Sequence, residues 1–403
     1  MPFVPLVVSF SFMIPEIANL ALAGATVYVS PTQEPLRDGV VLLHGGKIAA
    51  VGPRTNTHVP QTAETLNCSG LTITAGFWNS HVHFAERKWA NAADIPAPEA
   101  GRQLQDMLTR YGFTSVFDIT SAWENTRRLR DRIESGEVPG PRIRSTGEGL
   151  ISPGALPPDI VGYMMGWMKV PLPEIADAEQ AAAAAGKLLA EGVDGIKLFA
   201  SSPRSAPLPE SAIQAAATEA HRLGKPVFVH PNTGTDVLTA VRGGVDVIAH
   251  TTPHSGPWDE SILAAMIGQH VALTPTLWIW KYYARHDRIT TQDQIANTSI
   301  SQLRAWLASG GMVLFGNDLG AVDYDPTEEY VLMAEAGMSF RQILASLTTA
   351  PAERFGESQN LGRIAAGLQA DLVVLKHDPS EHIRGLTSVQ YTLRDGKIIY
   401  RAS

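Results

Sequence analysis

The chain of 403 residues is long enough for one large domain and a minor one, and its 44% hydrophobic and 18% charged residues are ordinary for a globular protein. The net charge of -8 argues against nucleic acid as a partner. Cys68 is the only cysteine, which excludes an internal disulfide and a cysteine-cluster metal site.

The N-terminus is apolar and uncharged, reading MPFVPLVVSFSFM over residues 1–13. This run is too short to span a bilayer as a helix, and it lacks the Lys or Arg that precedes the apolar part of a secretory signal. A degenerate export signal, a packing segment and a true start at Met13 all stay open, so residues 1–18 are an N-terminal extension without an assigned role. We expect a cytoplasmic protein with no membrane partner.

Both ends of the remaining chain are rich in short β-prone runs. They lie at residues 21–30, 39–43 and 47–51, and again at 370–375, 389–393 and 398–400. The last run follows an Asp395-Gly396 turn, which is a strong hairpin signal. We therefore predict a small β-sandwich domain built from residues 19–75 together with 356–403. The alternative is a pair of unrelated β extensions.

The middle of the chain, residues 76–355, alternates apolar runs with helix-compatible stretches such as 176–191, 209–223 and 236–242. Eight runs are predicted as strands: 71–84, 115–120, 142–146, 195–199, 227–230, 246–250, 271–276 and 312–316. This alternation predicts the α/β class and a closed (β/α)₈ TIM barrel. An open doubly wound sheet is the alternative, but no Gly-rich phosphate turn follows an early strand.

Metal-ligating residue types stand at matching places in these runs. His81 and His83 are two residues apart near the end of the first strand, so both imidazoles should point the same way. Later runs carry further candidates: Lys197 within GIKLF, His230, His250 and Asp318. Each residue alone has an ordinary explanation, such as a capped strand end. Because active sites of barrels lie where strands end, the six together predict a site for zinc or a related divalent ion.

Five segments resemble the amidohydrolase superfamily: GFWNSHVHF at 76–84, GIKLF at 195–199, VFVH at 227–230, GGVDVIAH at 243–250 and FGND at 315–318. Their order matches strands one, four, five, six and eight of that superfamily, and the resemblance covers nearly the whole chain. These segments are similar to those of the prolidase-like and imidazolonepropionase-related branch of the superfamily. Asn79 and Asn317 depart from the Asp and Thr common there, and the first departure can alter the orientation of His81.

The resemblance implies a binuclear centre with two divalent metal ions, expected to be Zn²⁺. His81, His83 and Asp318 would hold one ion, and His230 and His250 the other. A charged Lys197 would repel metals, so the resemblance and electrostatics together imply its carboxylation by carbon dioxide into a bridging anion. The implied catalytic residues are Asp318, Lys197 and His250, with a metal-bridging hydroxide and Asp318 as proton shuttle.

The implied reaction is hydrolysis of an amide-type C–N bond, most simply in a dipeptide or an N-acyl amino acid. Candidate substrate-binding residues lie in the loops after strands: Tyr163, Met164, Trp167, His254, Trp278, Trp280, Lys281, Tyr282 and Arg285. Packing on the barrel explains the aromatic ones equally well. We expect a small-molecule substrate, and a homo-oligomer is compatible with the sequence.

Other functions stay open at this point. A lactonase or esterase could use the same metal centre, because the centre acts on the bond and the loops determine which substrate binds. A mononuclear deaminase or deacetylase lacks the bridging lysine, so Lys197 argues against it. A non-catalytic scaffold barrel would be expected to have lost ligands, whereas all six are present.

Overall fold

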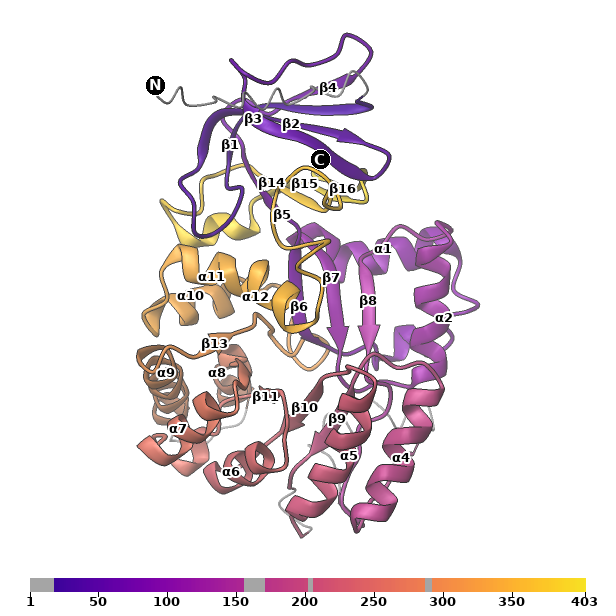
Figure 1. Ribbon diagram of the computed structural model, residues 1–403, viewed down its shortest axis with the longest axis vertical. Coiled ribbons are helices and arrows are strands. Elements are labelled where there is room, and N and C mark those ends of the chain that lie inside the picture. The colour runs from indigo at the N-terminus through magenta and orange to yellow at the C-terminus, as the bar shows by residue number, and fades with distance from the viewer. Residues whose placement is uncertain (1–17, 156–170, 202–205, 287–291) are drawn as a thin grey trace, which may run out of the picture.

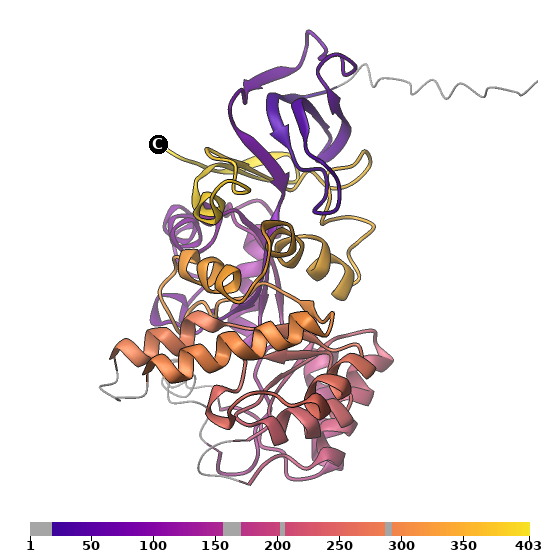
Figure 2. The ribbon, with the colours of Figure 1, turned by 90° about the vertical axis from the view of Figure 1, so that its left-hand side faces the viewer.

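The computed structural model describes residues 18–155, 171–201, 206–286 and 292–403. A β-rich part lies at one end of the molecule and an α/β part fills the rest (Figure 1). The turned view shows the same division, with the indigo and yellow segments of the two chain ends together in the β-rich part (Figure 2).

The β-rich part is one eight-stranded sheet assembled from both ends of the chain. Its strands are β1 (Leu20–Val27), β2 (Leu36–His44), β3 (Lys47–Pro53), β4 (Glu64–Asn67), β5 (Thr72–Ala75), β14 (Leu372–Leu375), β15 (Val389–Arg394) and β16 (Lys397–Arg401). Antiparallel pairing of β5 with β14 joins the N-terminal strands to the C-terminal ones. Leu22, Val41 and Leu372 share one buried cluster there, so neither end could bury its apolar face alone.

The α/β part contains two sheets in which every strand pair is parallel. The first consists of β6 (Phe77–Val82), β7 (Phe113–Asp118) and β8 (Arg142–Ser145). The second consists of β9 (Ile196–Phe199), β10 (Val227–His230), β11 (Val247–Ala249), β12 (Ala272–Thr274) and β13 (Met312–Val313). Hydrogen bonds link the sheets at both edges: Leu150 N to Lys197 O at 2.8 Å, and Ser80 N to Phe315 O at 2.7 Å.

Helices follow the strands of the α/β part and cover them from outside, as α4, α5 and α6 cover the β9–β11 region in Figure 1. They are α1 (Ala97–Met107), α2 (Trp123–Glu134), α4 (Ala178–Ala190), α5 (Glu210–Arg222), α6 (Gly234–Arg242), α7 (Glu260–Gly268), α8 (Leu277–His286), α9 (Gln292–Ala308), α10 (Thr327–Glu335), α11 (Phe340–Leu347) and α12 (Thr349–Arg354). Local side chains cap several of them. Asp177 accepts from Gln180 N at the start of α4, and Thr233 forms a capping box at the start of α6.

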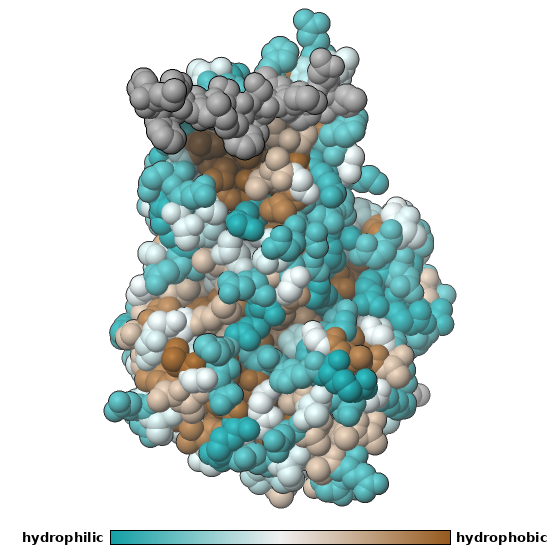
Figure 3. All heavy atoms as spheres, viewed as in Figure 1, coloured by the Kyte–Doolittle hydropathy of each residue, from teal (hydrophilic) through white to brown (hydrophobic). Residues whose placement is uncertain are grey.

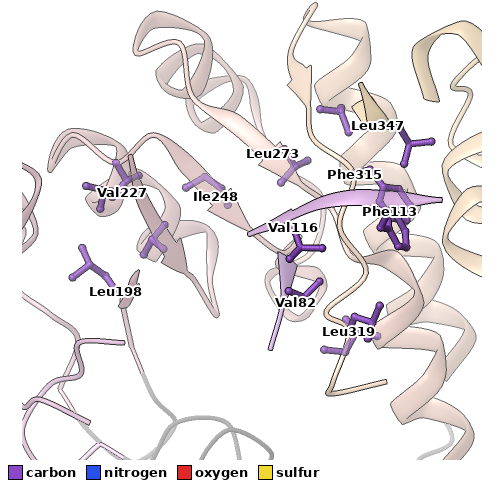
Figure 4. Close-up of a cluster of buried hydrophobic side chains, with 14 of the residues drawn as sticks. Val82, Phe113, Val116, Leu198, Val227, Ile248, Leu273, Phe315, Leu319 and Leu347 are labelled. Carbon is purple, nitrogen blue, oxygen red and sulfur yellow. The ribbon is translucent and has the colours of Figure 1, made fainter. Parts of the chain in front are cut away.

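Side chains alternate between two buried faces along β9, β10 and β11. Leu198, Val227 and Ile248 belong to a large buried cluster between strands and helices (Figure 4). Phe228, one position from Val227, lies in a different cluster with Phe117 and Phe355, their ring centroids 4.6 and 5.9 Å from its own. By the same alternation Lys197 faces away from the helices, toward the inner side.

Several predicted boundaries were wrong in detail. The run at 71–84 is two strands, β5 and β6, which belong to different sheets and are separated by Gly76. A Cβ at Gly76 would lie 2.2 Å from Thr114 Oγ1, so only glycine fits this crossing between the two parts. The helix predicted at 236–242 begins at Gly234, because Thr233 caps it.

The face shown in Figure 3 is hydrophilic over much of the α/β part, while apolar residues gather at the β-rich end. None of the helices in the described ranges is long and apolar enough to cross a membrane.

Candidate metal centre

The six candidate residues come from strands or from positions just after them. His81 lies in β6 and His83 follows it, Lys197 lies in β9, and His230 ends β10. His250 follows β11, and Asp318 lies five residues beyond β13. Parallel strands bring all these positions to their carboxyl ends, where side chains from distant parts of the chain can meet.

Asp318 forms the centre of contacts on one side of the site. Its Oδ1 lies 3.2 Å from His81 Nε2 and 2.9 Å from His83 Nε2. The ring of His250 lies 4.7 Å from that of His81, centroid to centroid, and 4.5 Å from that of His230. The structure therefore brings all four histidines and the carboxylate into one cluster.

Lys197 is buried next to this cluster, with 1% of its surface exposed. Its Nζ lies 5.3 Å from the ring centroid of Phe199, and that ring lies 5.5 Å from His230. Burial lowers the pKa of Lys197 to about 7, and the charge of Asp318 only partly offsets this. A substantial fraction of the amine is therefore neutral at ordinary pH.

Hydrogen bonds fix which nitrogen of two histidines carries the proton. His83 Nδ1 lies 2.9 Å from the carbonyl oxygen of Thr120, which can only accept, so Nδ1 carries a proton. His250 Nδ1 lies 2.7 Å from Thr276 Oγ1, whose own proton goes to the carbonyl of Pro275. In both rings Nδ1 is used by the protein, and Nε2 is the nitrogen left for a metal ion.

Backbone strain is concentrated at these strand ends. Thr120, His250, Thr276 and Asp318 have φ angles of 142°, 89°, 46° and 57°, in a region that favours glycine. Such residues persist only where the surrounding structure holds them, and they are typical of functional sites.

Burial favours the neutral form of three of the histidines. It lowers the pKa of His81 to about 4 and that of His230 to about 3, and it lowers the pKa of His250 well below its usual range. Burial opposes ionisation of Asp318, but its contacts with His81 and His83 outweigh this and hold the pKa of the carboxyl well below its usual range. Neutral imidazoles and an ionised carboxylate are the forms that bind metal.

The donor set fits a divalent cation. Ligand atoms of His81, His250 and Asp318 all lie within 4.8 Å of one another. His83 Nε2 faces Asp318 Oδ1 at 2.9 Å. An imidazole nitrogen and a carboxylate oxygen this close need a proton or a metal ion between them, so the arrangement suits an ion held by both atoms.

Asn79 and Asn317 bond to each other beneath the site. Asn79 Nδ2 donates to Asn317 Oδ1 at 2.7 Å, and Asn79 Oδ1 accepts from the main-chain N of His81 at 3.2 Å. The departure at Asn79 thus touches the backbone of His81, while His81 Nδ1 has no partner among the described residues.

The predicted substrate-binding residues differ in how exposed they are, and some lie outside the described residues. Exposed His254 packs edge-on against Trp280, with ring centroids 5.6 Å apart, and Trp280 Nε1 donates to Thr251 Oγ1. Trp278 is 4% exposed, and Lys281 and Tyr282 are partly exposed. Tyr163, Met164, Trp167 and the side chain of Arg285 lie outside the described residues.

The two threonines that orient histidines, Thr120 and Thr276, were not among the predicted site residues. Their positions, just after β7 and β12, were inside or at the end of predicted strands. A threonine is common in strands, so its type gives no signal of this role.

The fold and the cluster define the class: an α/β protein with a candidate metal site at the carboxyl ends of its parallel strands. The model of the amidohydrolase family matches residues 72–399, and the chain therefore belongs to the amidohydrolase family. The resemblance seen in the five sequence segments is confirmed, as is an α/β fold with an additional part.

Known proteins are similar over nearly the full length. Ochratoxinase of Aspergillus niger is 20% identical, over 91% of this chain and 83% of its own. The fold is similar to that of a Xaa-Pro dipeptidase with bound methionine in the active site, with a TM-score of 0.82 at 22% identity over 95% of this chain and 100% of the other. A prolidase complexed with N-methylphosphonate-L-proline has a TM-score of 0.77 at 27% identity, with the same coverage.

Proposed function

We propose that this protein is a binuclear metal-dependent amidohydrolase that cleaves the C–N bond of a dipeptide or an N-acyl amino acid. The observation that carries the proposal is the convergence of four histidines on Asp318 beside a buried Lys197. Similarity to a prolidase at 27% identity supports a dipeptide-like substrate, and similarity to ochratoxinase is compatible with an amide.

The proposal includes the finer architecture expected from the sequence. Eight parallel strands in chain order, with hydrogen bonds at both junctions between the two sheets, support a closed (β/α)₈ barrel. The shared core of strands from both chain ends supports a small β-sandwich domain. Residues 19–75 with 356–403, and residues 76–355, remain the proposed domain bounds.

In this proposal His81, His83 and Asp318 hold one divalent ion, and His230 and His250 hold the other, with Zn²⁺ as the expected metal. Bound ions of this kind bring the pKa of water toward neutrality and polarise a carbonyl group. Lys197 would bridge them as a carbamate: its neutral amine forms an N–C bond to carbon dioxide and releases a proton. The lowered pKa of Lys197, about 7, supports this reaction because only the neutral amine is nucleophilic.

Asp318 is the proposed proton shuttle. Its pKa lies well below the usual range, so the carboxylate is ionised and able to accept a proton from the attacking water. The same group can then donate that proton to the leaving nitrogen. His250, 4.0 Å from Asp318 Oδ2 through Nδ1, lies next to this shuttle.

The start of α8 and the loop after β11 form the proposed binding surface for a small-molecule substrate. Trp280 and His254 offer an apolar wall, and Lys281 offers a cation for a carboxylate. The net charge of -8 supports the absence of a nucleic-acid partner. A homo-oligomer and a cytoplasmic location remain predictions.

The test is a screen of Xaa-Pro dipeptides and N-acyl amino acids with zinc-, manganese- and cobalt-loaded protein. We expect amide cleavage that Asp318→Asn reduces by about 10²–10⁴-fold. Asp131→Asn, on the exposed face of α2, is the matched control and should change nothing. Cleavage of esters or lactones alone by metal-replete protein would refute the proposed amide specificity and favour a lactonase or esterase.

A further inference from the structure

Two fully buried carboxylates, Asp118 and Glu329, have no part in the proposed chemistry. Both are 0% exposed. Asp118 ends β7, two residues before Thr120, and Glu329 lies in α10, far in sequence from His250. Burying a carboxylate is costly unless it is fully hydrogen-bonded.

Asp118 binds two groups close to His83. Its Oδ1 accepts from Ser121 Oγ at 2.5 Å and from the main-chain N of Phe84, the residue after His83, at 3.3 Å. Ser121 Oγ in turn accepts from Phe84 N at 2.8 Å and lies 2.8 Å from the Thr120 carbonyl oxygen. That oxygen is the acceptor for His83 Nδ1. Asp118 therefore fixes the backbone beside His83, and the Ser121 hydroxyl that it binds packs against the carbonyl that orients the ring.

Glu329 performs the equivalent task for His250. Its Oε1 accepts from Leu277 N at 2.9 Å, and its Oε2 accepts from Trp278 N at 2.7 Å. These two amides directly follow Thr276, the residue whose hydroxyl orients His250. They are also the first amides of α8, so a side chain from α10 supplies the cap that α4 and α6 obtain from their own flanking residues.

The two threonines share a feature that explains why they need such anchors. Thr120 and Thr276 are β-branched and have φ angles of 142° and 46°. A β-branched residue with positive φ is an outlier that neighbouring contacts must hold in place. In each case a buried carboxylate holds the turn, and the turn orients one histidine.

We propose that Asp118 and Glu329 are positioning residues, each of which orients one metal-binding histidine through a strained threonine. Asp118 positions His83, and Glu329 positions His250. Because Glu329 also caps α8, which carries Trp280 and Lys281, it additionally fixes the proposed substrate surface. The inference rests on the proposed metal centre but not on the identity of the substrate.

The test measures the tautomers of His83 and His250 in two variants of the metal-free protein. Nuclear magnetic resonance of protein labelled with ¹⁵N-histidine should show His83 and His250 as Nδ1–H tautomers in the wild type. Asp118→Asn should mix the tautomers of His83 and leave His250 unchanged. Glu329→Gln should do the reverse. A merely structural role would disturb neither ring, or both together.

Metal affinity and kinetics give a second readout. Each variant should bind zinc about 10–100-fold more weakly in chelator competition, the loss expected when a partner of a metal-bound histidine is removed. Glu329→Gln should also raise KM several-fold, because α8 moves, whereas Asp118→Asn should lower kcat with little change in KM. Glu328→Gln, on the exposed side of α10 where it binds Arg384, is the matched control and should match the wild type.

Wild-type tautomers and wild-type zinc affinity in both variants would overturn the inference. If Asp118→Asn does not fold, Ser121→Ala removes the same link to Thr120, and Glu329→Asp can replace Glu329→Gln. A wild-type protein that binds no metal would refute the proposed function instead, and the tautomers of the metal-free protein would still decide between positioning and structural roles.

Discussion

The two halves of the proposed binuclear metal centre differ in how complete they are. His81 and His83 have a fixed carboxylate within 3.2 Å, because Asp318 lies against both rings. His230 and His250 have a buried lysine as their companion, and Asp318 Oδ2 reaches His250 only at 4.0 Å. The first half is ready for a cation as it stands. The second half needs a change in the charge of Lys197 before it can hold one well.

The largest expected effect follows from that asymmetry. Lys197→Met should leave the first half intact and remove the bridging anion, so the metal content should fall from two ions per chain to one and activity should fall at least about 100-fold. Elemental analysis with activity assays on protein loaded in bicarbonate buffer measures both. Lys187→Met, on the exposed face of α4, is the control. If Lys197→Met retained two ions per chain, the second half of the site would not depend on Lys197.

Metal removal should have the next largest effect. Ions that bind the folded chain and not the unfolded one stabilise it by about 2.7 kcal/mol when their concentration is 100 times Kd. Chelation should therefore lower the Tm of wild-type protein by several degrees. It should lower that of Lys197→Met by less, since one half of the site is already lost. Equal decreases in the Tm of wild-type protein and Lys197→Met, measured by calorimetry, would contradict the proposed difference between the two halves of the site.

The pH dependence of metal-free protein should show a smaller effect. Burial lowers the pKa values of His81 and His230 to about 4 and about 3, from about 6.5 in the unfolded chain. Below pH 6.5 the unfolded state therefore binds more protons, and stability falls as pH falls toward 4. Urea unfolding at a series of pH values between 7 and 4.5 measures this.

Glu329 offers a check on the sign of that pH effect. Burial raises its pKa to about 8, so its contribution is present at low pH and is lost as pH rises from about 4.5 through about 8. Glu329→Gln removes this opposing contribution, and the loss of stability on acidification should become steeper. Stability that is flat or rises on acidification in the variant would be inconsistent with neutral buried histidines.

The smallest effect concerns Asn79. Asn79→Asp adds a charge behind His81, and a flip of the Asn317 amide would let its Nδ2, which has no partner among the described residues, donate to the new carboxylate. We expect zinc to bind a few-fold more tightly in the His81 half, with little change in stability. Chelator competition measures the affinity. Unchanged affinity would show that Asn79 supports the backbone of His81 and does not tune the metal.

The sequence by itself determined the residue types of the site and the sides of the strands on which they lie. The spacing of His81 and His83, and the place of Lys197 between Ile196 and Leu198, follow from the two-residue period of a strand. The order of the motifs indicated the family, and apolar runs at both chain ends indicated a shared β-rich part. These are local patterns, which can be recognised in the amino-acid sequence alone.

Only the tertiary structure decided which distant groups touch. Asp318 meets His81 across 237 positions of sequence, and Glu329 caps a helix more than 50 residues away. The positive φ of His250, which turns its ring into the cluster just past β11, has no counterpart in residue type. The division of the run at 71–84 between two sheets also depended on packing around Gly76. Such contacts form only when long loops close around a common core, so they depend on the whole fold and not on any short segment.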